Sequence, residues 1–271
     1  MIKAVVTGAG GRMGRRILAL LAERSDISIG GAAEQAGHPL VGRDAGEGAG
    51  IGKTGIVIRE DLAACIADGD VVIDFSHHEA SVRHLEIAAR TGRAIVIGST
   101  GFTPAEERKI RELAPATRCV TAPNMSVGVN VMYKLLDMAA RILGDEYDVE
   151  IVEAHHRLKK DAPSGTALKM ARVLAHALGR DLDEIGIYAR RGLIGERTKP
   201  EIGLQTVRAG DIVGEHTVIF GGMGERLEVI HRAHSRDNFA RGAIRAALWV
   251  VSRPKGLYDM QDVLGLKDLG T

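Results

Sequence analysis

A glycine-rich turn near the N-terminus constrains the fold of this chain more than any other feature. Gly8-Ala9-Gly10-Gly11-Arg12-Met13-Gly14 follows the apolar segment Ile2 to Thr7 and precedes a segment with apolar residues at helical spacing. This order predicts a strand, a tight turn and a helix. Because glycines let backbone N–H groups and a helix N-terminus approach a pyrophosphate, it also predicts dinucleotide binding. Met13 occupies the third glycine position of G-x-G-x-x-G, so the spacing is G-x-x-G-x-x-G. The alternative is a tight turn that binds no ligand.

The first half of the chain repeats this alternation of strand and helix. One helix is predicted from Glu79 to Thr91, before Gly92, and another where Thr103, Pro104 and Glu106 form a capping-box pattern. Apolar strands separated by helices predict an α/β fold with a doubly wound, Rossmann-type parallel sheet. The segment from Gly37 to Gly55 holds seven glycines in 19 residues and is predicted to be a mobile loop. The further predicted strands are Ile27 to Ala33, Ile56 to Ile58, Val71 to Phe75, Ala94 to Gly98 and Arg118 to Ala122.

The pattern changes after Ser126. A long amphipathic helix is predicted from Val129 to Leu143, and strands with polar alternation and one helix, Thr166 to Leu178, follow it. This predicts a second, α+β domain with an open mixed sheet over residues 127–236. A last helix, Phe239 to Ser252, is expected to return to a first domain made of residues 1–126 plus 237–271. The predicted strands of the second domain are Asp148 to Ala154, Gln205 to Arg208, His216 to Phe220 and Arg226 to Arg232.

Composition excludes several classes of partner. Lys+Arg 36 against Asp+Glu 35 leaves a net charge of +1, which does not favour nucleic acid or an anionic membrane. No apolar segment is long enough to span a bilayer, and the N-terminus lacks the apolar core of a signal peptide. Two cysteines, Cys65 and Cys119, fall short of a disulfide framework or a structural zinc site, so no metal is expected. We therefore expect a cytoplasmic protein.

An acidic residue after the second predicted strand bears on the choice of cofactor. Glu34 lies 26 positions after Gly8, near the usual offset of a ribose-binding carboxylate. Such a carboxylate accepts hydrogen bonds from ribose hydroxyls and repels a 2′-phosphate, and Gln35 supplies no positive charge. This favours NADH, although Arg12 is near enough in sequence to reach a phosphate. The alternative for Glu34 is a solvated strand end.

Two further loops follow predicted strands at the edge where open parallel sheets bind ligands. They are Gly98-Ser99-Thr100-Gly101 and Ala122-Pro123-Asn124-Met125-Ser126, placed to hold the nicotinamide half of a dinucleotide; each alone is equally compatible with an ordinary turn. Gly48 to Thr54 resembles a phosphate-binding loop of kinases. Glu47 stands where that motif requires its first glycine, and the segment leads into a strand, so the motif is rejected.

The densest group of reactive side chains lies between Glu153 and Thr166. His155, His156, Arg157, Lys159 and Lys160 follow a predicted strand, and Ser164-Gly165-Thr166 then opens a helix. Adjacent histidines provide a proton donor near neutral pH, and a nearby lysine serves as an acid or an anion clamp. The N–H groups and hydroxyls at a helix start suit a carboxylate. The alternative is a solvated basic loop before a capped helix.

Two other candidate groups are given no function. His77-His78-Glu79 is predicted to be a surface turn, and Cys119 a buried, inert thiol.

These motifs together resemble the bacterial dihydrodipicolinate reductase family over nearly the whole chain. The histidine pair joined to Ser-Gly-Thr is specific to that family, whereas the glycine turn alone is not. Further matching segments are Ile97 to Phe102, Ser126 to Met132, Asp161 to Leu168 and Arg208 to His216.

The resemblance implies a homotetramer that uses NADH or NADPH to reduce a cyclic dicarboxylate imine to tetrahydrodipicolinate, in diaminopimelate and lysine biosynthesis. It implies that His155 is the proton donor, with Lys159 as its catalytic partner. His156, Gly165 and Thr166 would hold a substrate carboxylate, with Lys160 nearby, and Arg236 and Phe239 would add contacts. Residues Gly8 to Met13, Glu34, Gly98 to Thr100 and Ala122 to Met125 would line the cofactor site.

Two departures and two alternatives accompany this resemblance. Many members have an arginine where this chain has Gln35, and a serine where it has His234. The alternatives are a non-catalytic NAD-binding sensor, and a semialdehyde-type dehydrogenase with Cys119 as its nucleophile.

Overall fold

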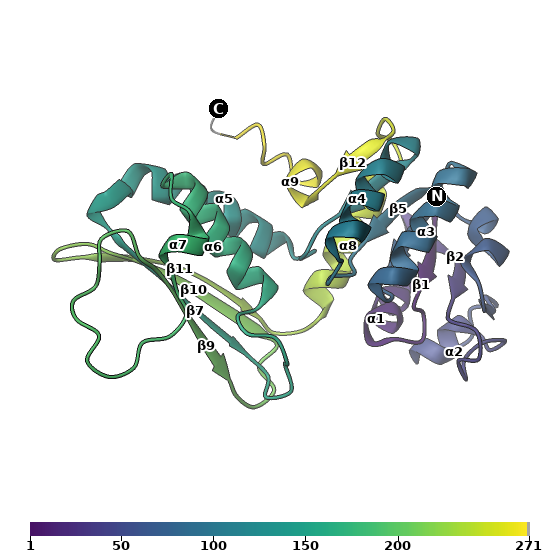
Figure 1. Ribbon diagram of the computed structural model, residues 1–271. Coiled ribbons are helices and arrows are strands. Elements are labelled where there is room, and N and C mark those ends of the chain that lie inside the picture. The colour runs from purple at the N-terminus through teal and green to yellow at the C-terminus, as the bar shows by residue number, and fades with distance from the viewer. Residues whose placement is uncertain (270–271) are drawn as a thin grey trace. The chain divides into compact units, whose positions relative to one another are not determined.

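The computed structural model describes residues 1–269, which divide into two compact units. The first comprises Met1–Val127 and the described residues from Arg236 onward, and the second comprises Gly128–Ser235 (Figure 1). The roles that the sequence predicts for these two parts stay predictions.

The first unit is built on a seven-stranded, wholly parallel sheet in the order β12-β6-β5-β4-β1-β2-β3. The predicted doubly wound parallel sheet is confirmed. Strands β2 and β3 lie on one side of β1, while β4, β5, β6 and β12 lie on the other, so the winding direction reverses between β1 and β4. The strands are β1 Ile2–Thr7, β2 Ile27–Ala33, β3 Ile58–Arg59, β4 Val71–Asp74, β5 Ala94–Ile97, β6 Arg118–Thr121 and β12 Gly256–Tyr258.

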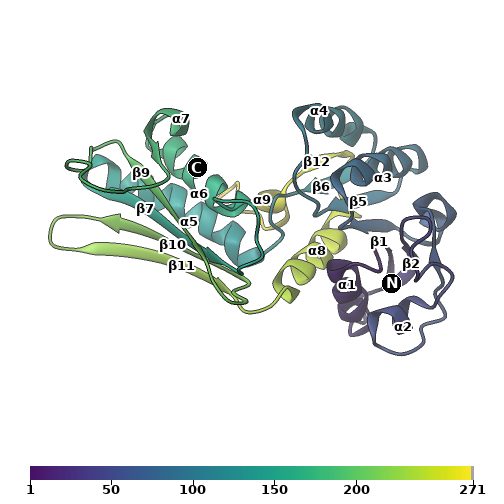
Figure 2. The ribbon, with the colours of Figure 1, turned by 60° about the horizontal axis from the view of Figure 1, so that its bottom comes forward.

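Helices cover both faces of this sheet because successive side chains of each strand point to opposite sides. In β1, Ala4 and Val6 pack in the core that contains the apolar faces of α1 and α8, whereas Val5 packs in the core beneath α3 and α4. Figure 2 shows these helices beside the sheet of the first unit. The helices of this unit are α1 Arg12–Ala22, α2 Ala45–Ala49, α3 His78–Thr91, α4 Pro104–Leu113, α8 Asp237–Val250 and α9 Met260–Val263, with short 3-10 turns at Leu62–Ala64, Ile66–Asp68 and Ala114–Ala116.

The predicted helix ends are confirmed where local chemistry determines them. Gly92 ends α3 in the left-handed conformation, at φ 68°. At the start of α4, the Thr103 hydroxyl accepts from the Glu106 N–H, and the Glu106 carboxylate accepts from the Thr103 N–H, which completes the capping box.

The segment from Gly37 to Gly55 is not the loop that its glycines predict. It contains helix α2, and the Asp44 carboxylate accepts hydrogen bonds from the N–H groups of Gly46, Glu47, Thr54 and Gly55 at 2.6 to 3.2 Å. These bonds hold the pKa of Asp44 far below its ordinary value, against partial burial. Asp44 and Val57 also form an isolated antiparallel backbone bridge. Strand β3 begins at Ile58, after this bridge, and not at Ile56 as predicted.

The second unit is built on a five-stranded sheet in the order β11-β10-β7-β9-β8. The predicted mixed sheet is confirmed, with β8 as a strand that the sequence did not predict. Strand β10 is antiparallel to β7 and β11, while β9 is parallel to β7 and β8. Helices α5 and α6 lie over one face of this sheet (Figure 1). The elements are α5 Val127–Leu143, a 3-10 turn at Gly144–Glu146, β7 Asp148–His155, α6 Gly165–Ala177, α7 Leu182–Ile185, β8 Gly186–Ile187, β9 Ile202–Arg208, β10 Gly214–Gly221 and β11 Arg226–Ala233.

Within residues 1–269, no helix combines the length and apolar character needed to cross a bilayer. The same residues contain no group of three or more histidine, cysteine or acidic side chains arranged to hold a metal ion.

Candidate functional site

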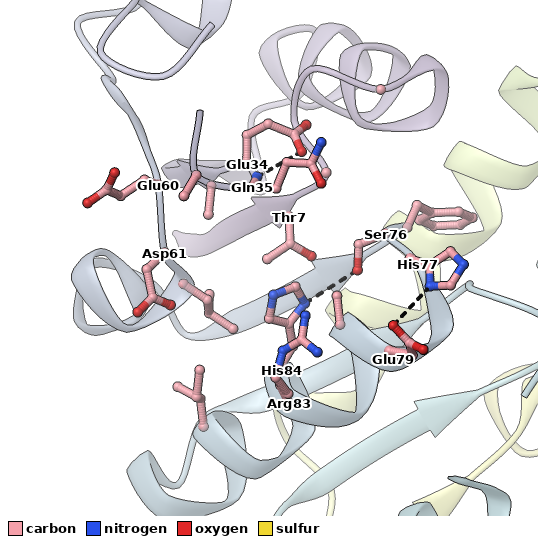
Figure 3. Close-up of a pocket in the computed structure, with 18 residues that line it drawn as sticks. Thr7, Glu34, Gln35, Glu60, Asp61, Ser76, His77, Glu79, Arg83 and His84 are labelled. Atoms are coloured by element: carbon pink, nitrogen blue, oxygen red, sulfur yellow. Dashed lines mark hydrogen bonds and ion pairs between the residues drawn. The ribbon is translucent and has the colours of Figure 1, made fainter. Parts of the chain in front are cut away.

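A cavity of about 720 Å³ opens in the first unit at the carboxyl ends of β1, β2, β3 and β4. This is where the winding direction of the sheet reverses, the usual ligand position in open parallel sheets. Figure 3 shows Glu34 and Gln35 on one side of the cavity and Ser76, Arg83 and His84 on the other.

The glycine turn fits a dinucleotide pyrophosphate. Gly8 has φ 66°, which lets the chain leave β1 and enter α1 within a few residues. A Cβ on Gly14 would lie 2.1 Å from the Gly8 carbonyl oxygen, so only glycine allows α1 to start this close to the strand. Gly11, the N-cap of α1, offers no side chain to the first N–H groups of the helix, which leaves them for an anion.

The backbone N–H groups of the glycine turn differ in their hydrogen-bond partners. Ala9 is buried and donates its N–H to the Ala33 carbonyl, and Gly11 donates to the Gly8 carbonyl. Gly10 donates to the Glu34 carboxylate at 2.9 Å. Arg12 and Met13 form the first turn of α1. The N–H groups of the first helical turn, rather than those of the loop before it, are therefore the ones left for phosphate.

Glu34 directly follows β2 and lines the cavity, and its contact with ribose stays a prediction. Its two carboxylate oxygens accept from the N–H groups of Gly10 and Gln35, both at 2.9 Å. A carboxylate oxygen has two acceptor positions, so each retains capacity for a hydroxyl donor. Glu60 and Asp61 add two acidic groups to the lining near the same strand ends.

The two other predicted loops follow β5 and β6 along the same edge of the sheet. Gly98 packs against the ring of Phe75, where a Cβ would lie 2.2 Å from the nearest ring atom. The Ser99 hydroxyl donates to the Ser76 carbonyl and accepts from Ser81, so its polar groups support the cavity wall. Thr100 follows and is exposed.

The loop after β6 is held from behind by α8. A Cβ on Gly242 would lie 1.8 Å from the Met125 carbonyl oxygen, and the Met125 side chain is buried in the core. Asn124 accepts from the Ser126 N–H at 2.8 Å, which fixes the turn. Ala122 is buried too, and Pro123 is exposed.

The sequence reasoning missed a buried carboxylate that supports the cavity wall by bonding to its lining residues Thr7, Ser76 and His84. Asp74 is fully buried at the end of β4 and accepts from Thr7 at 2.9 Å, from the Ser76 hydroxyl at 2.5 Å and from His84 Nδ1 at 3.2 Å. Burial acts to raise the pKa of Asp74, but these bonds, led by that from His84, lower it. The sequence feature that could have revealed Asp74 is an aspartate at the carboxyl end of a predicted buried strand. His77 is exposed as predicted, at the N-cap of α3, and lines the cavity, whereas His78 and Glu79 belong to the helix and not to a turn.

In the second unit, the reactive side chains Glu153 and His155 lie on the face of β7 that packs in the core. Val149 and Ile151 of β7 point into the core, and Glu153 and His155 continue the same face toward the end of the strand. Glu153 is 1% exposed and accepts from His155 Nδ1 at 2.6 Å and from both terminal nitrogens of Arg208 at 2.8 Å. Burial alone would raise the pKa of Glu153, but these bonds lower it to about 2.

His216, opposite Glu153 on β10, completes the group and was not predicted as a site residue. Its ring is 3% exposed, packs edge-on against the His155 ring at a centroid distance of 5.2 Å, and its Nε2 pairs with the Ser164 hydroxyl at 3.2 Å. Burial, aided by the nearby His155, lowers the pKa of His216 to about 3, so this ring is neutral.

The other predicted site residues of this unit lie on the loop after β7 and at the start of α6. His156 Nδ1 is buried and has no hydrogen-bond partner within residues 1–269. Lys159 Nζ contacts both oxygens of Asp161 at 2.8 Å. Ser164 caps α6, since its hydroxyl accepts from the Ala167 N–H. Burial raises the pKa of Tyr133, against a hydrogen bond with Thr166, the second residue of α6.

Cys119 behaves as the sequence predicts. It is fully buried within β6, and burial raises the pKa of its thiol to about 12. A neutral, inaccessible thiol does not act as a nucleophile.

Comparisons with known proteins agree with the fold and cover both units. The model of the dihydrodipicolinate reductase N-terminus matches residues 2–125, and that of its C-terminus matches residues 128–264. The 4-hydroxy-tetrahydrodipicolinate reductase of Syntrophus aciditrophicus (strain SB) is 67% identical over 98% of this chain and 100% of the relative. The same enzyme of Geotalea uraniireducens (strain Rf4) is 57% identical over the same shares.

Among solved structures, a dipicolinate-bound dihydrodipicolinate reductase from Paenisporosarcina sp. TG-14 superposes with a TM-score of 0.74. It covers 97% of this chain and 98% of that chain at 23% identity, which supports the shared fold. From the family models and the full-length relatives, this chain belongs to the dihydrodipicolinate reductase family.

Proposed function

We propose that this chain is an NAD(P)H-dependent reductase that converts 4-hydroxy-tetrahydrodipicolinate into tetrahydrodipicolinate. One observation carries the proposal: the strand end that bears His155 and the N-terminus of α6 meet at the same buried carboxylate, Glu153, in a chain 67% identical to a reductase of that name. A proton donor beside an anion-binding helix start suits the reduction of a small dicarboxylate.

A nicotinamide dinucleotide fits the first unit. The first turn of α1 would hold its pyrophosphate, and Glu34 would accept from its adenosine ribose. When bound, this cofactor supplies the hydride. Glu34, Glu60 and Asp61 give the cavity a negative side, and Gln35 offers no cation against a 2′-phosphate, which supports use of NADH at least as well as NADPH.

The second unit supplies the proton and holds the substrate. When the conjugated ring accepts a hydride, negative charge develops on its nitrogen or on the conjugated carbon, and His155 donates a proton there. Lys159 assists from the same loop. His156, whose buried Nδ1 has no partner among residues 1–269, and the N–H groups of Gly165 and Thr166 would hold a substrate carboxylate.

We also propose that the second unit forms the contacts of a homotetramer. The face of its sheet opposite α5 and α6 carries exposed apolar side chains, including Val207 and Ile230, each 43% exposed. Burial of such side chains between subunits would stabilise an assembly. Light scattering coupled to size exclusion measures the mass directly. A monomer at micromolar concentration would contradict this part of the proposal. A cytoplasmic location stays a prediction.

The reductase is tested in a coupled assay in which dihydrodipicolinate synthase generates the substrate and NADH absorbance is followed. We expect turnover by the wild type and a loss of kcat of about 100-fold or more in His155→Ala and in Lys159→Ala. Binding of NADH, measured by fluorescence, should stay within about twofold, because both residues lie outside the first unit. NADH binding without any turnover would instead support the sensor alternative.

A further inference from the structure

Glu153 is a buried carboxylate of the second unit that accepts five hydrogen bonds. The donors are four residues on two strands and one loop: His155 of β7, Thr206 and Arg208 of β9, and the N–H of Ser164. A carboxylate that is 1% exposed is costly to bury unless its acceptor positions are filled and its charge is paired. Here both conditions are met, and the pairing fixes the position of every partner.

The bond to His155 determines which ring nitrogen can react. An ionised carboxylate only accepts hydrogen bonds, so His155 Nδ1 carries the proton in the 2.6 Å contact. The other nitrogen, Nε2, is then the one that exchanges a proton with a substrate. Gly214 of β10 leaves room for it, since a Cβ at that position would lie 3.1 Å from Nε2.

The opposite side of the carboxylate acts on the substrate-holding segment. Oε1 accepts at 3.0 Å from the N–H of Ser164, the residue that caps α6. Arg208 extends the connection, since it bonds both carboxylate oxygens and also donates to the Asp161 carbonyl at 2.6 Å. Asp161 in turn pairs with Lys159. The proton donor, its lysine partner and the helix start therefore share one anchor.

We propose that Glu153, paired with Arg208, is the positioning residue of this site, which fixes His155 with Nε2 as the reacting nitrogen and holds the α6 N-terminus in register with it. This inference rests on the proposed function. Glu153 does not touch substrate; it acts through His155 and Ser164.

The charges around His155 predict how its protonation responds to the loss of Glu153. Glu153 is the negative group that contacts the ring, and Asp161 lies on the adjoining loop. Arg208 and Lys159 are cationic, while His216 is neutral and faces the ring, with His231 behind it. Without the Glu153 charge, the surroundings become net cationic and disfavour the protonated ring.

Glu153→Gln is the decisive variant. Both carboxylate oxygens accept hydrogen bonds from N–H donors, whereas the glutamine amide can accept through only one of these positions. If its NH₂ group takes the Oε2 position, it donates to His155 Nδ1 and favours the tautomer with the proton on Nε2. We expect kcat to fall about 100-fold or more, with NADH affinity within about twofold. We also expect the alkaline limb of the kcat/KM profile to move to lower pH by about one unit. A lost fold alone would not move that limb.

Glu150→Gln provides the matched control on the same strand. Glu150 is also paired with arginines, Arg190 and Arg197, but it lies on the opposite face of β7 from His155. We expect a wild-type kcat and pH profile. An equal loss of kcat in Glu150→Gln would overturn the proposal, since the effect would then come from the sheet.

Two measurements remain decisive if Glu153→Gln does not fold. In the wild type, long-range ¹H–¹⁵N spectra of histidine-labelled protein, assigned with His155→Ala, should show the Nδ1–H tautomer; the Nε2–H tautomer would refute the inference. Gly214→Ala keeps the carboxylate but crowds Nε2, and should lower kcat at least about tenfold. Full turnover in His155→Ala would refute the proposed proton donor itself. Loss there, with wild-type kcat and pH profile in Glu153→Gln, would refute only the role of Glu153.

Discussion

Replacement of Gly14 by alanine tests whether the contact between α1 and the first turn is what makes the dinucleotide site. The added Cβ would lie 2.1 Å from the Gly8 carbonyl oxygen and 2.8 Å from the Ala9 Cα. Both neighbours are backbone atoms, so the strain cannot be relieved by a change of rotamer. The helix start must move by about 1 Å to restore an ordinary contact distance.

The expected free-energy change combines two opposing effects. Alanine is favoured over glycine in a helix by about 1 kcal/mol. Forced overpacking in a close-packed interior costs about 1–3 kcal/mol, and here the upper part of that range applies because backbone must shift. We therefore expect the first unit to lose about 1–2 kcal/mol of unfolding free energy. Because the N–H groups of α1 are displaced from the phosphate position, NADH should bind at least about tenfold more weakly.

The assay uses a reporter that the chain already contains. Trp249, its single tryptophan, lies in α8 of the first unit and packs edge-on against Tyr258. Urea unfolding followed by its fluorescence gives the stability of that unit, and NADH titration gives affinity. Gly48→Ala is the matched control, since Gly48 is also helical but a Cβ there meets only side-chain carbons at 3.5 Å. Equal stability and affinity in the two variants would refute the argument.

Three further outcomes are expected. The wild type should show kcat/KM for NADH at least equal to that for NADPH, and Glu34→Gln combined with Gln35→Arg should raise the NADPH value about tenfold, a gain of ~1.4 kcal/mol; a strong NADPH preference of the wild type in steady-state assays would contradict this. Cys119→Ser should keep kcat within about twofold in the coupled assay, since its thiol is buried with a raised pKa, and a loss of turnover would revive the thiol mechanism. Because the folded-state pKa of His216 is lowered from 6.5 to about 3, the stability that depends on its neutral form is full above pH 6.5 and is lost as pH falls toward 3. Urea unfolding across that range, monitored by circular dichroism, should be less pH-dependent in His216→Asn, and an unchanged slope would contradict the assignment.

The features that the sequence predicts well are those determined by neighbours along the chain. The strand Ile2–Thr7, the capping box at Thr103 and the glycine that ends α3 depend on residues within a few positions, and all three occur as expected. The Rossmann-type sheet follows because apolar strands alternate with helices.

The features that the sequence does not reveal depend on partners far apart along the chain. Asp44 organises the glycine-rich segment through donors 10 and 11 positions away, and nothing in the glycine pattern indicates that a carboxylate holds them. Glu153 meets Arg208 across 55 positions because β7 and β9 pair in parallel. Local spacing located the histidines, but only the pairing of strands shows what holds them.

Strand β7 ties the chemistry of this protein to its packing. Val149, Ile151, Glu153 and His155 occupy alternate positions on one face, and two of them belong to the core while two belong to the site. A deletion of one residue anywhere in that strand would therefore turn its apolar residues outward and its reactive residues away in a single step. Substitutions can change these residues one by one, but an insertion or deletion changes the face on which the following residues lie. Insertions and deletions in this family should therefore collect in the loops before and after β7.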